Sequence, residues 1–199
     1  MSHSQHPALS DVFVKVDVDE ELDAAVDVVI STTFAPSQAL SATVEISSDG
    51  QTVCEKMISI AELEETAHFS LNKPTLWYPR RYGNQSLHTV TVTLKDDSGA
   101  VLDTATKQVG FRRAELVQHA LVDQPGKSFF FRVNNIDIFA AGSNWIPAHS
   151  FESLLTESDY KDWVKVVVDG NQDMLRIWGG GFYEDDMLLA ECVSRCLVD

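Results

Sequence analysis

The fold of the second half of this chain is decided by the stretch Met174-Leu175-Arg176-Ile177-Trp178-Gly179-Gly180-Gly181-Phe182-Tyr183-Glu184. A short apolar run that leads into a tryptophan, three glycines and an acidic residue indicates a buried strand, a tight turn and the start of a helix. Three consecutive glycines allow positive φ angles and let another group approach the backbone closely. A tryptophan at the carboxyl end of such a strand can present its ring to a ligand, and the C–H face of a sugar suits an indole.

A helical pattern precedes this strand. Thr156 is a suitable N-cap with Asp159 three residues later, and the pattern ends at Gly170. Its apolar stripe consists of Tyr160, Trp163, Val164, Val167 and Val168. With a second helix expected to open near Glu184, the order strand, helix, strand, helix predicts a parallel α/β fold after residue 113. Two parallel strands leave open edges, so we expect this part to belong to a longer chain.

The first half has a different pattern, in which apolar residues alternate with polar ones. Such alternation is typical of strands with one buried face, and it occurs in Val12–Val18, Val26–Ile30 and Val90–Leu94. Asp49-Gly50 and Ser98-Gly99 suit the hairpin turns between such runs. About seven short strands in this half predict an immunoglobulin-like β-sandwich. The predicted organisation is a flexible leader over residues 1–10, the sandwich over residues 11–112 and the α/β part over residues 113–199.

Charge and cysteine content narrow the classes of partner. The 199 residues include 30 acidic and 15 basic ones, a formal net charge of −15, which argues against binding to nucleic acid or to an anionic membrane. No apolar run approaches the roughly 20 residues that cross a bilayer. The polar N-terminus lacks the pattern of a secretory signal, so a cytoplasmic location is expected. Cys192 and Cys196 make at most half of a metal site, so neither a metal nor another cofactor is predicted.

Several motifs make this sequence resemble one family. In order along the chain they are Trp77-Tyr78-Pro79, Tyr82–Leu87, Gly110–Gln118, Phe129–Asn134, Gly142–Ala148 and Asn171–Glu184. Together they resemble the β-mannosidases of glycoside hydrolase family two. The Trp-Gly-Gly-Gly form favours the mannosidases over the galactosidases, glucuronidases and exo-glucosaminidases of that family. The family usually has an aromatic residue, a glycine, a lysine and an acidic residue where this sequence has His88, Asn135, Ala141 and His149.

The resemblance implies an exo-acting enzyme that removes terminal β-linked mannose from an oligosaccharide or glycan with retention of configuration. Retaining chemistry needs two carboxyl groups about 5–5.5 Å apart, one as the nucleophile and one as the acid/base. In the family both are glutamates on later barrel strands, and the sequence is expected to end before either of them. The resemblance therefore implies the central immunoglobulin-like domain followed by the truncated start of a (β/α)8 TIM barrel, without catalytic residues.

Four residues are candidates for the substrate-binding site. With the resemblance, Trp178 is interpreted as the platform of a mannose subsite rather than as a core tryptophan. Arg176 either braces the pocket through charge-assisted hydrogen bonds or pairs with a structural carboxylate. Asn144 and Trp145 stand where the first barrel strand should end. They either line the same pocket or have a turn or strand-end role beside Pro147.

The acidic run Glu184-Asp185-Asp186 is interpreted as the start of a helix rather than as a catalytic pair. Adjacent side chains at a helix start diverge, and acidic residues there are favoured by the helix dipole. The alternative function from another class is a non-catalytic carbohydrate-binding or interaction module. That alternative predicts binding of a mannoside or of a partner without turnover, and the sequence makes no prediction of the oligomeric state.

Overall fold

The computed structural model describes residues 7–36, 38–181 and 183–195. The chain forms two compact units. The first, here called the sandwich unit, comprises Met1–Thr75 and Ser86–Phe111, and the second, here called the α/β unit, comprises Leu76–Gln85 and Arg112–Asp199. Residues 76–85 lie inside the range predicted for the sandwich, but they pack with the α/β unit.

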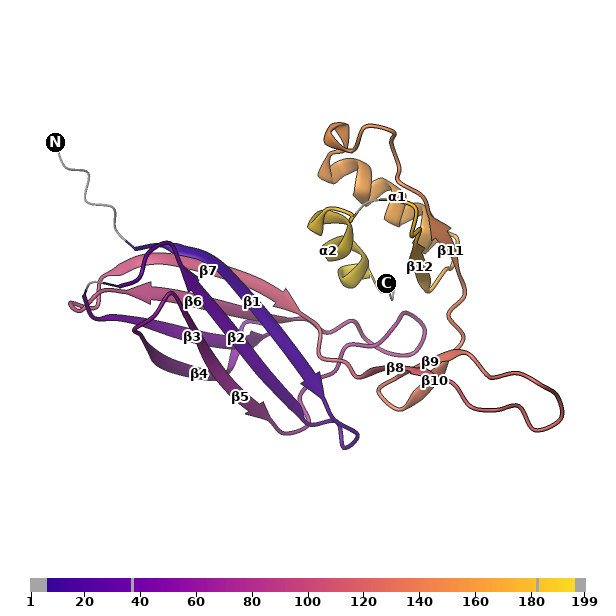
Figure 1. Cartoon of the computed structure of the whole chain (residues 1–199), viewed down its shortest axis with the longest axis horizontal. Helices are drawn as coiled ribbons and strands as arrows, with labels where there is room; N and C mark the ends of the chain where they lie inside the picture. The colour runs from indigo at the N-terminus through magenta and orange to yellow at the C-terminus, as the bar shows by residue number, and fades with distance from the viewer. Residues whose placement is uncertain (1–6, 37, 182, 196–199) are drawn as a thin grey trace. The chain divides into compact units, whose positions relative to one another are not determined.

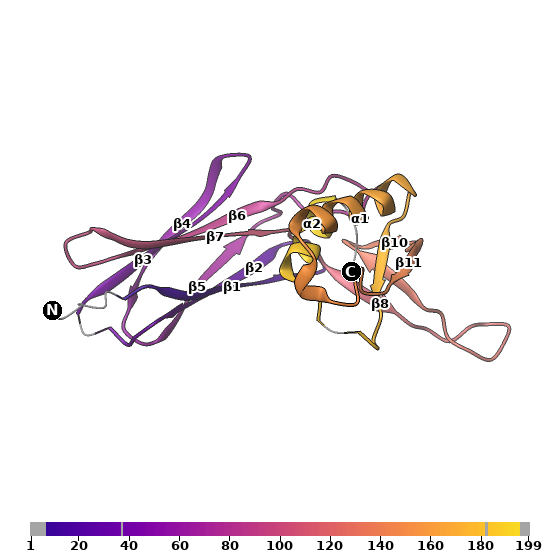
Figure 2. The same ribbon diagram turned by 90° about the horizontal axis from the view of Figure 1, so that it is seen from above.

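Seven strands of the described residues form the sandwich unit as two antiparallel sheets. One sheet has the order β1-β2-β5, from β1 (Leu9–Val18), β2 (Ala24–Thr32) and β5 (Glu64–Leu71). The other has the order β4-β3-β6-β7, from β3 (Leu40–Ser48), β4 (Gln51–Ile60), β6 (His88–Lys95) and β7 (Val101–Val109). Figure 2 shows the two sheets as two layers. The predicted β-sandwich is confirmed. Its fourth strand, β4, pairs with β3 at the edge of the second sheet.

Alternation places one face of each central strand in the core. Every second residue from Val26 to Ile30 in β2 and from Val90 to Leu94 in β6 is fully buried. The turn between β3 and β4 holds Asp49 and Gly50 at φ angles of 50° and 75°. A two-residue hairpin requires such left-handed backbone at both positions, because only then does the turn match the twist of the strands. The apolar residues of both sheets thereby meet in one core.

The α/β unit contains a small antiparallel sheet of order β10-β9-β8, from β8 (Ala114–Val117), β9 (Phe130–Val133) and β10 (Ile136–Ile138). Asn134 and Asn135 form the turn between β9 and β10, with φ angles of 47° and 64°. The buried Asn134 side chain accepts a hydrogen bond from the Arg113 backbone N–H and donates one to the Trp77 carbonyl, both at 2.9 Å. This side chain therefore connects three segments of the chain.

A strand–helix–strand–helix segment follows this sheet. The parallel strands β11 (Gly142–Trp145) and β12 (Met174–Ile177) are separated by the 3-10 helix η1 (Glu152–Leu154) and by α1 (Glu157–Asp169), and α2 (Asp186–Arg195) comes last. Thr156 caps α1, since its hydroxyl accepts from the Asp159 N–H while the Asp159 carboxylate accepts from the Thr156 N–H. The predicted order and cap are confirmed, and α2 begins two residues after Glu184.

Both helices pack on one face of this strand pair (Figure 1). Tyr160, Val164 and Val167 of the predicted helical stripe are buried there, whereas the Trp163 side chain is about half exposed. The core cluster comprises Trp145, Tyr160, Val164, Val167, Leu175, Leu188 and Cys192. Apolar residues from β11, α1, β12 and α2 thus share one interior.

Residues 76–85 contribute to the same unit. Trp77 has no exposed surface, and its Nε1 donates to the Val193 carbonyl of α2 at 2.9 Å. Arg112 stacks on the Trp77 ring, with its guanidinium carbon 4.6 Å from the ring centroid. Arg80 donates to the Val168 carbonyl near the end of α1. These contacts with both helices are the physical reason that residues 76–85 belong to the α/β unit rather than to the sandwich.

Candidate functional site

The strands β11 and β12 divide the predicted site residues between two environments. In the parallel register Asn144 lies beside Arg176, and Trp145 lies beside Ile177. Because successive residues of a strand point to opposite faces, Asn144 and Arg176 share one face. Trp145 and Ile177 share the other face, against which the helices pack. The four predicted site residues therefore do not line a single cavity, although Asn144 and Trp145 both border one of about 310 Å³ that includes neither Arg176 nor Trp178.

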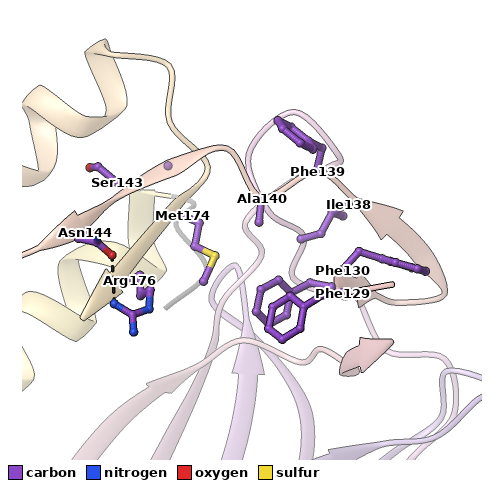
Figure 3. Close-up of a pocket in the computed structure, with 11 residues that line it drawn as sticks. Phe129, Phe130, Ile138, Phe139, Ala140, Ser143, Asn144, Met174 and Arg176 are labelled. Carbon is purple, nitrogen blue, oxygen red and sulfur yellow. Dashed lines mark hydrogen bonds between the residues drawn. The ribbon is translucent and has the colours of Figure 1, made fainter. Parts of the chain in front are cut away.

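Asn144 and Arg176 line a cavity of about 410 Å³. The Arg176 guanidinium donates from Nη1 to Asn144 Oδ1 at 3.1 Å. Figure 3 shows this pair on one side of the cavity and the rings of Phe129 and Phe130 on the other. Among the described residues Arg176 forms no ion pair, and its hydrogen-bond partner is the Asn144 side chain in the cavity wall.

The opposite wall of this cavity is aromatic and accessible. Phe129 and Phe139 line it, and their side chains are 67% and 80% exposed. A wall of aromatic rings across from a guanidinium suits a ligand with an apolar face and several hydroxyl groups, because the rings take the C–H surface while the guanidinium donates hydrogen bonds. A neutral sugar has this chemistry.

Trp178 lines a second cavity of about 460 Å³, together with Ile177, Gly179, Gly181, Tyr183, Glu184 and Leu189. It follows β12 directly, and its backbone N–H donates to the Trp145 carbonyl at 2.9 Å, which extends the hydrogen bonding of the strand pair. The Trp178 side chain is 47% exposed, whereas Trp145 is 5% exposed. Half of the Trp178 ring is thus accessible, but in a cavity different from that of Asn144 and Arg176.

Of the three glycines that follow Trp178, Gly180 is the one whose missing side chain allows a close approach. A Cβ on Gly180 would lie 2.7 Å from Cε2 and Cη2 of Trp178, so the indole rests on the bare backbone of this glycine. None of Gly179, Gly180 and Gly181 adopts the left-handed backbone that glycine allows. The turn closes with a hydrogen bond from the Gly181 N–H to the Trp178 carbonyl at 3.0 Å.

A fourth glycine in this region has a role that the sequence analysis missed. A Cβ on Gly142, the first residue of β11, would overlap the backbone of Met174, the first residue of β12. Only glycine allows the two strands to start this close together. A glycine that opens a predicted strand is the signal that could have indicated this contact.

Trp145 lies in the core, where the single polar atom of its side chain, Nε1, forms a hydrogen bond. Its ring is in edge contact with Trp163, with centroids 6.2 Å apart, and its Nε1 donates to Glu184 Oε1 at 2.8 Å. Two roles were considered for Trp145, and its burial fits the strand-end role rather than a place in the wall of the Trp178 cavity. Burial raises the pKa of Glu184 above its ordinary value, while the hydrogen bond from Trp145 opposes that shift. Glu184 was interpreted only as part of a helix start, so its contact with Trp145 was missed.

The rest of the acidic run belongs to the start of α2. Asp185 Oδ1 accepts from the Met187 N–H at 2.8 Å, and Asp186 occupies the first turn. In the part of the chain that the structure describes, no group of three or more His, Cys, Asp or Glu side chains could hold a metal ion. Cys192 is buried in the core, and Cys196 lies outside the described residues.

No helix among the residues described is both long enough and apolar enough to cross a membrane.

Comparison with known proteins identifies related sequences. The model of the family described as "Glycosyl hydrolases family 2" matches residues 8–112. A curated relative, beta-mannosidase B from Thermothelomyces thermophilus, is 42% identical over 186 residues, which are 92% of this chain and 21% of that protein. Beta-mannosidase B from Aspergillus terreus is 40% identical over 147 residues, which are 74% of this chain and 17% of that protein. The chain thus spans about one fifth of the length of these relatives.

Solved structures show the same likeness. The crystal structure of beta-D-mannosidase from Dictyoglomus thermophilum matches with a TM-score of 0.82 and 33% identity, over 96% of this chain and 24% of that one. The beta-glucuronidase of Parabacteroides merdae matches with a TM-score of 0.79 and 16% identity, over 96% of this chain and 24% of that one. At 16% identity the likeness to the glucuronidase concerns the fold alone.

Proposed function

Because this chain belongs to the glycosyl hydrolases of family 2, we propose that it is part of a retaining exo-β-mannosidase, which removes terminal β-D-mannose from oligosaccharides or glycans. The proteins that support this choice of substrate are the two beta-mannosidase B relatives and the Dictyoglomus enzyme, at 33–42% identity. In this proposal β11, α1, β12 and α2 are the first two repeats of a (β/α)8 barrel. The nucleophile and the acid/base, two carboxyl groups about 5–5.5 Å apart, come from later strands of a longer protein.

The position of Trp178 is the observation that carries the proposal. Active sites of (β/α)8 barrels lie at the carboxyl ends of the strands. Trp178 directly follows the carboxyl end of β12, and about half of its side chain is accessible. We therefore assign to Trp178 the stacking of the mannose ring. Asn144 and Arg176, one register position before the ends of β11 and β12, line the other cavity, and they are assigned hydrogen bonds to hydroxyl groups of the glycan outside the ring that stacks on Trp178.

Binding by the chain itself tests this assignment. Calorimetric titration with mannobiose should show binding that Trp178→Ala abolishes, because the stacking surface is lost. Phe13→Ala is the control, since Phe13 is an aromatic residue of β1 that is 59% exposed and lines neither cavity. The chain alone should hydrolyse no chromogenic β-mannoside. Turnover by the pure chain that Trp178→Ala leaves unchanged would overturn both the site and the mechanism.

Sequencing the transcript on both sides of this reading frame separates the enzyme from the non-catalytic binding module. A frame that continues into a barrel with two glutamates at strand ends supports the enzyme. A transcript that encodes no such pair of glutamates contradicts the catalytic proposal. The chain would then be a module that binds mannosides without turnover.

A further inference from the structure

Glu184 belongs to the wall of the cavity that holds Trp178, but its carboxyl oxygens face the protein. Oε1 accepts the hydrogen bond of the Trp145 indole at 2.8 Å. Oε2 has no accessible surface and no hydrogen-bond partner among the described residues. A ligand in the cavity therefore cannot reach this oxygen, and a direct role of Glu184 in sugar binding does not fit its geometry.

Trp145 connects both ends of the glycine turn. At the start of the turn, the Trp178 backbone N–H donates to the Trp145 carbonyl at 2.9 Å. At the end of the turn, the Trp145 indole donates to Glu184. Trp178 and Glu184 are thus both bonded to one buried residue, the first to its backbone and the second to its side chain. Loss of the second bond would leave the turn attached at one end only.

The surroundings of Glu184 favour a neutral carboxyl group. The hydroxyl of Tyr160 is also buried without a partner, and Glu184 is the charged group with the largest effect on the pKa of Tyr160, which it raises. The acidic side chains of Glu152 and Asp185 also act on this region, and the ion pairs of the described residues bring no cation to Glu184. A carboxylic acid brings one proton to a place where two buried oxygens lack a partner.

We propose that Glu184 is a positioning residue for the sugar platform: through its hydrogen bond with Trp145, it fixes the far end of the glycine turn and so sets the orientation of Trp178. The inference rests on the proposed function of Trp178, because only a platform needs a fixed orientation. It also gives a role to the burial of Trp145, for which the sequence left a pocket role and a strand-end role open. Trp145 acts on the site through the turn that it holds.

Fluorine spectroscopy of the chain tests the positioning directly. The chain has four tryptophans, at positions 77, 145, 163 and 178, so incorporation of 5-fluorotryptophan gives four signals that single Trp→Phe variants assign. Glu184→Gln keeps the oxygen that accepts from Trp145 and carries no charge, so the Trp145 and Trp178 signals should stay near their wild-type positions. Glu184→Ala should move both signals and bring Trp178 to the shift of a solvated indole. An unchanged Trp77 signal shows that the unit is folded.

A matched control variant removes a negative charge but leaves the hydrogen bond between Trp145 and Glu184 in place. Asp186→Asn takes one negative charge from the same helix start, and it should leave all four fluorine signals in place. A Trp178 signal that is the same in Glu184→Ala as in the wild type would overturn the proposal. A Glu184→Gln variant that behaves like Glu184→Ala would show that the acceptor oxygen alone does not hold the turn, and it would overturn positioning through this hydrogen bond.

Mannobiose affinity then separates this inference from the proposed function. Glu184→Ala should bind mannobiose at least about tenfold more weakly, the effect of losing one well-placed hydrogen bond, and Glu184→Gln should restore the affinity. Equal affinity in the wild type and in Glu184→Ala would contradict a role of positioning in binding. If the wild type binds no mannobiose, the proposed function fails for this chain, and the fluorine signals still decide whether Glu184 positions Trp178.

Discussion

Arg81 and Asp173 form a bidentate ion pair across 92 residues of sequence: Arg81 Nε donates to Asp173 Oδ1 at 3.0 Å, and Nη2 donates to Oδ2. The Asp173 side chain is 2% exposed and that of Arg81 is 44% exposed. Asp173 lies one residue before β12, and its backbone N–H donates to the Ala141 carbonyl, one residue before β11. The pair therefore holds the place where the two parallel strands begin.

Removal of the arginine should destabilise the α/β unit. Arg81→Met leaves a buried carboxylate without its partner, which costs about 3–5 kcal/mol where the pair is fully buried. Because Arg81 is partly exposed, water screens the charge, and we expect a loss of about 2 kcal/mol. All four tryptophans lie in the α/β unit, so urea unfolding followed by tryptophan fluorescence measures this unit.

The exposed pair of Arg132 and Asp137 provides the control for this measurement. Its side chains are 37% and 56% exposed, so Arg132→Met should change the free energy of unfolding by less than about 1 kcal/mol. Equal losses in the two variants would show that the bond between Arg81 and Asp173 contributes no more than a surface pair.

His88 packs as an aromatic ring in the sandwich unit. It stacks on Phe111 with ring centroids 4.1 Å apart and an angle of 14° between the rings, and it is 1% exposed. Burial lowers the pKa of His88 below its ordinary value of 6.5, although the charge of Asp49 opposes the shift. His88 is thus held in the core by ring stacking, and its surroundings favour the neutral imidazole.

The stability of the sandwich unit should therefore fall in mild acid. The unfolded state takes up a proton at a higher pH than the folded state does, so this contribution is fully present above about pH 6.5 and is lost as the pH falls towards the lowered pKa. His88→Phe should remove this part of the pH dependence, measured as urea unfolding by circular dichroism at pH 7.5 and 5. The exposed His68 gives the control variant His68→Gln. Parallel pH dependence in the wild type and His88→Phe would contradict the prediction.

Gly180→Ala should displace the Trp178 ring. The new methyl group would occupy the space of the indole, and the half-exposed ring can turn outwards at a cost of about 1 kcal/mol or less. Gly179→Ala is the control, because no heavy atom lies within 4 Å of its Cβ position, and it should be neutral or stabilising by about 0.4–1 kcal/mol. The fluorine signal of Trp178 should move in the first variant and not in the second. A fixed signal in both would show that the ring does not rest on Gly180.

Asn134→Ala should destabilise the α/β unit by about 3 kcal/mol. The substitution leaves the Arg113 N–H and the Trp77 carbonyl without their partner, and each lost bond at a buried group costs about 1–3 kcal/mol. Asn171→Ala controls for the backbone, because the exposed Asn171 has a similar φ of 56° and should cost only about 1 kcal/mol. Urea unfolding by tryptophan fluorescence measures both. Similar losses of unfolding free energy in the two variants would assign the cost to the backbone conformation alone.

The sandwich could be predicted because its signals are local. Alternation from Val26 to Ile30 and a turn at Asp49-Gly50 each follow from a few neighbouring residues. The same holds for α1, whose cap at Thr156 and apolar stripe lie within one short segment. The packing of residues 76–85 could not be predicted in this way, because a contact such as that of Arg81 with Asp173 leaves no periodic trace in the sequence.

The candidate site could be predicted only in part. The sequence placed Trp178 correctly after a strand, and it identified the glycines as a place of close approach. It did not separate Trp145 from Asn144, although strand alternation puts neighbours on opposite faces. Glu184 was missed because its importance depends on a buried indole N–H that needs an acceptor, and the burial of Trp145 is a property of the folded core.

The sequence by itself determined the secondary structure and the family, because periodicity, caps, turns and motifs are written in residues close together along the chain. Only the tertiary structure decided which side chains share a cavity, which tryptophan is buried and which acidic residue has a buried partner. The reason is that burial and hydrogen bonding depend on the atoms that surround a group in space. Around Trp178 those atoms come from β11, the glycine turn and the residues that lead into α2.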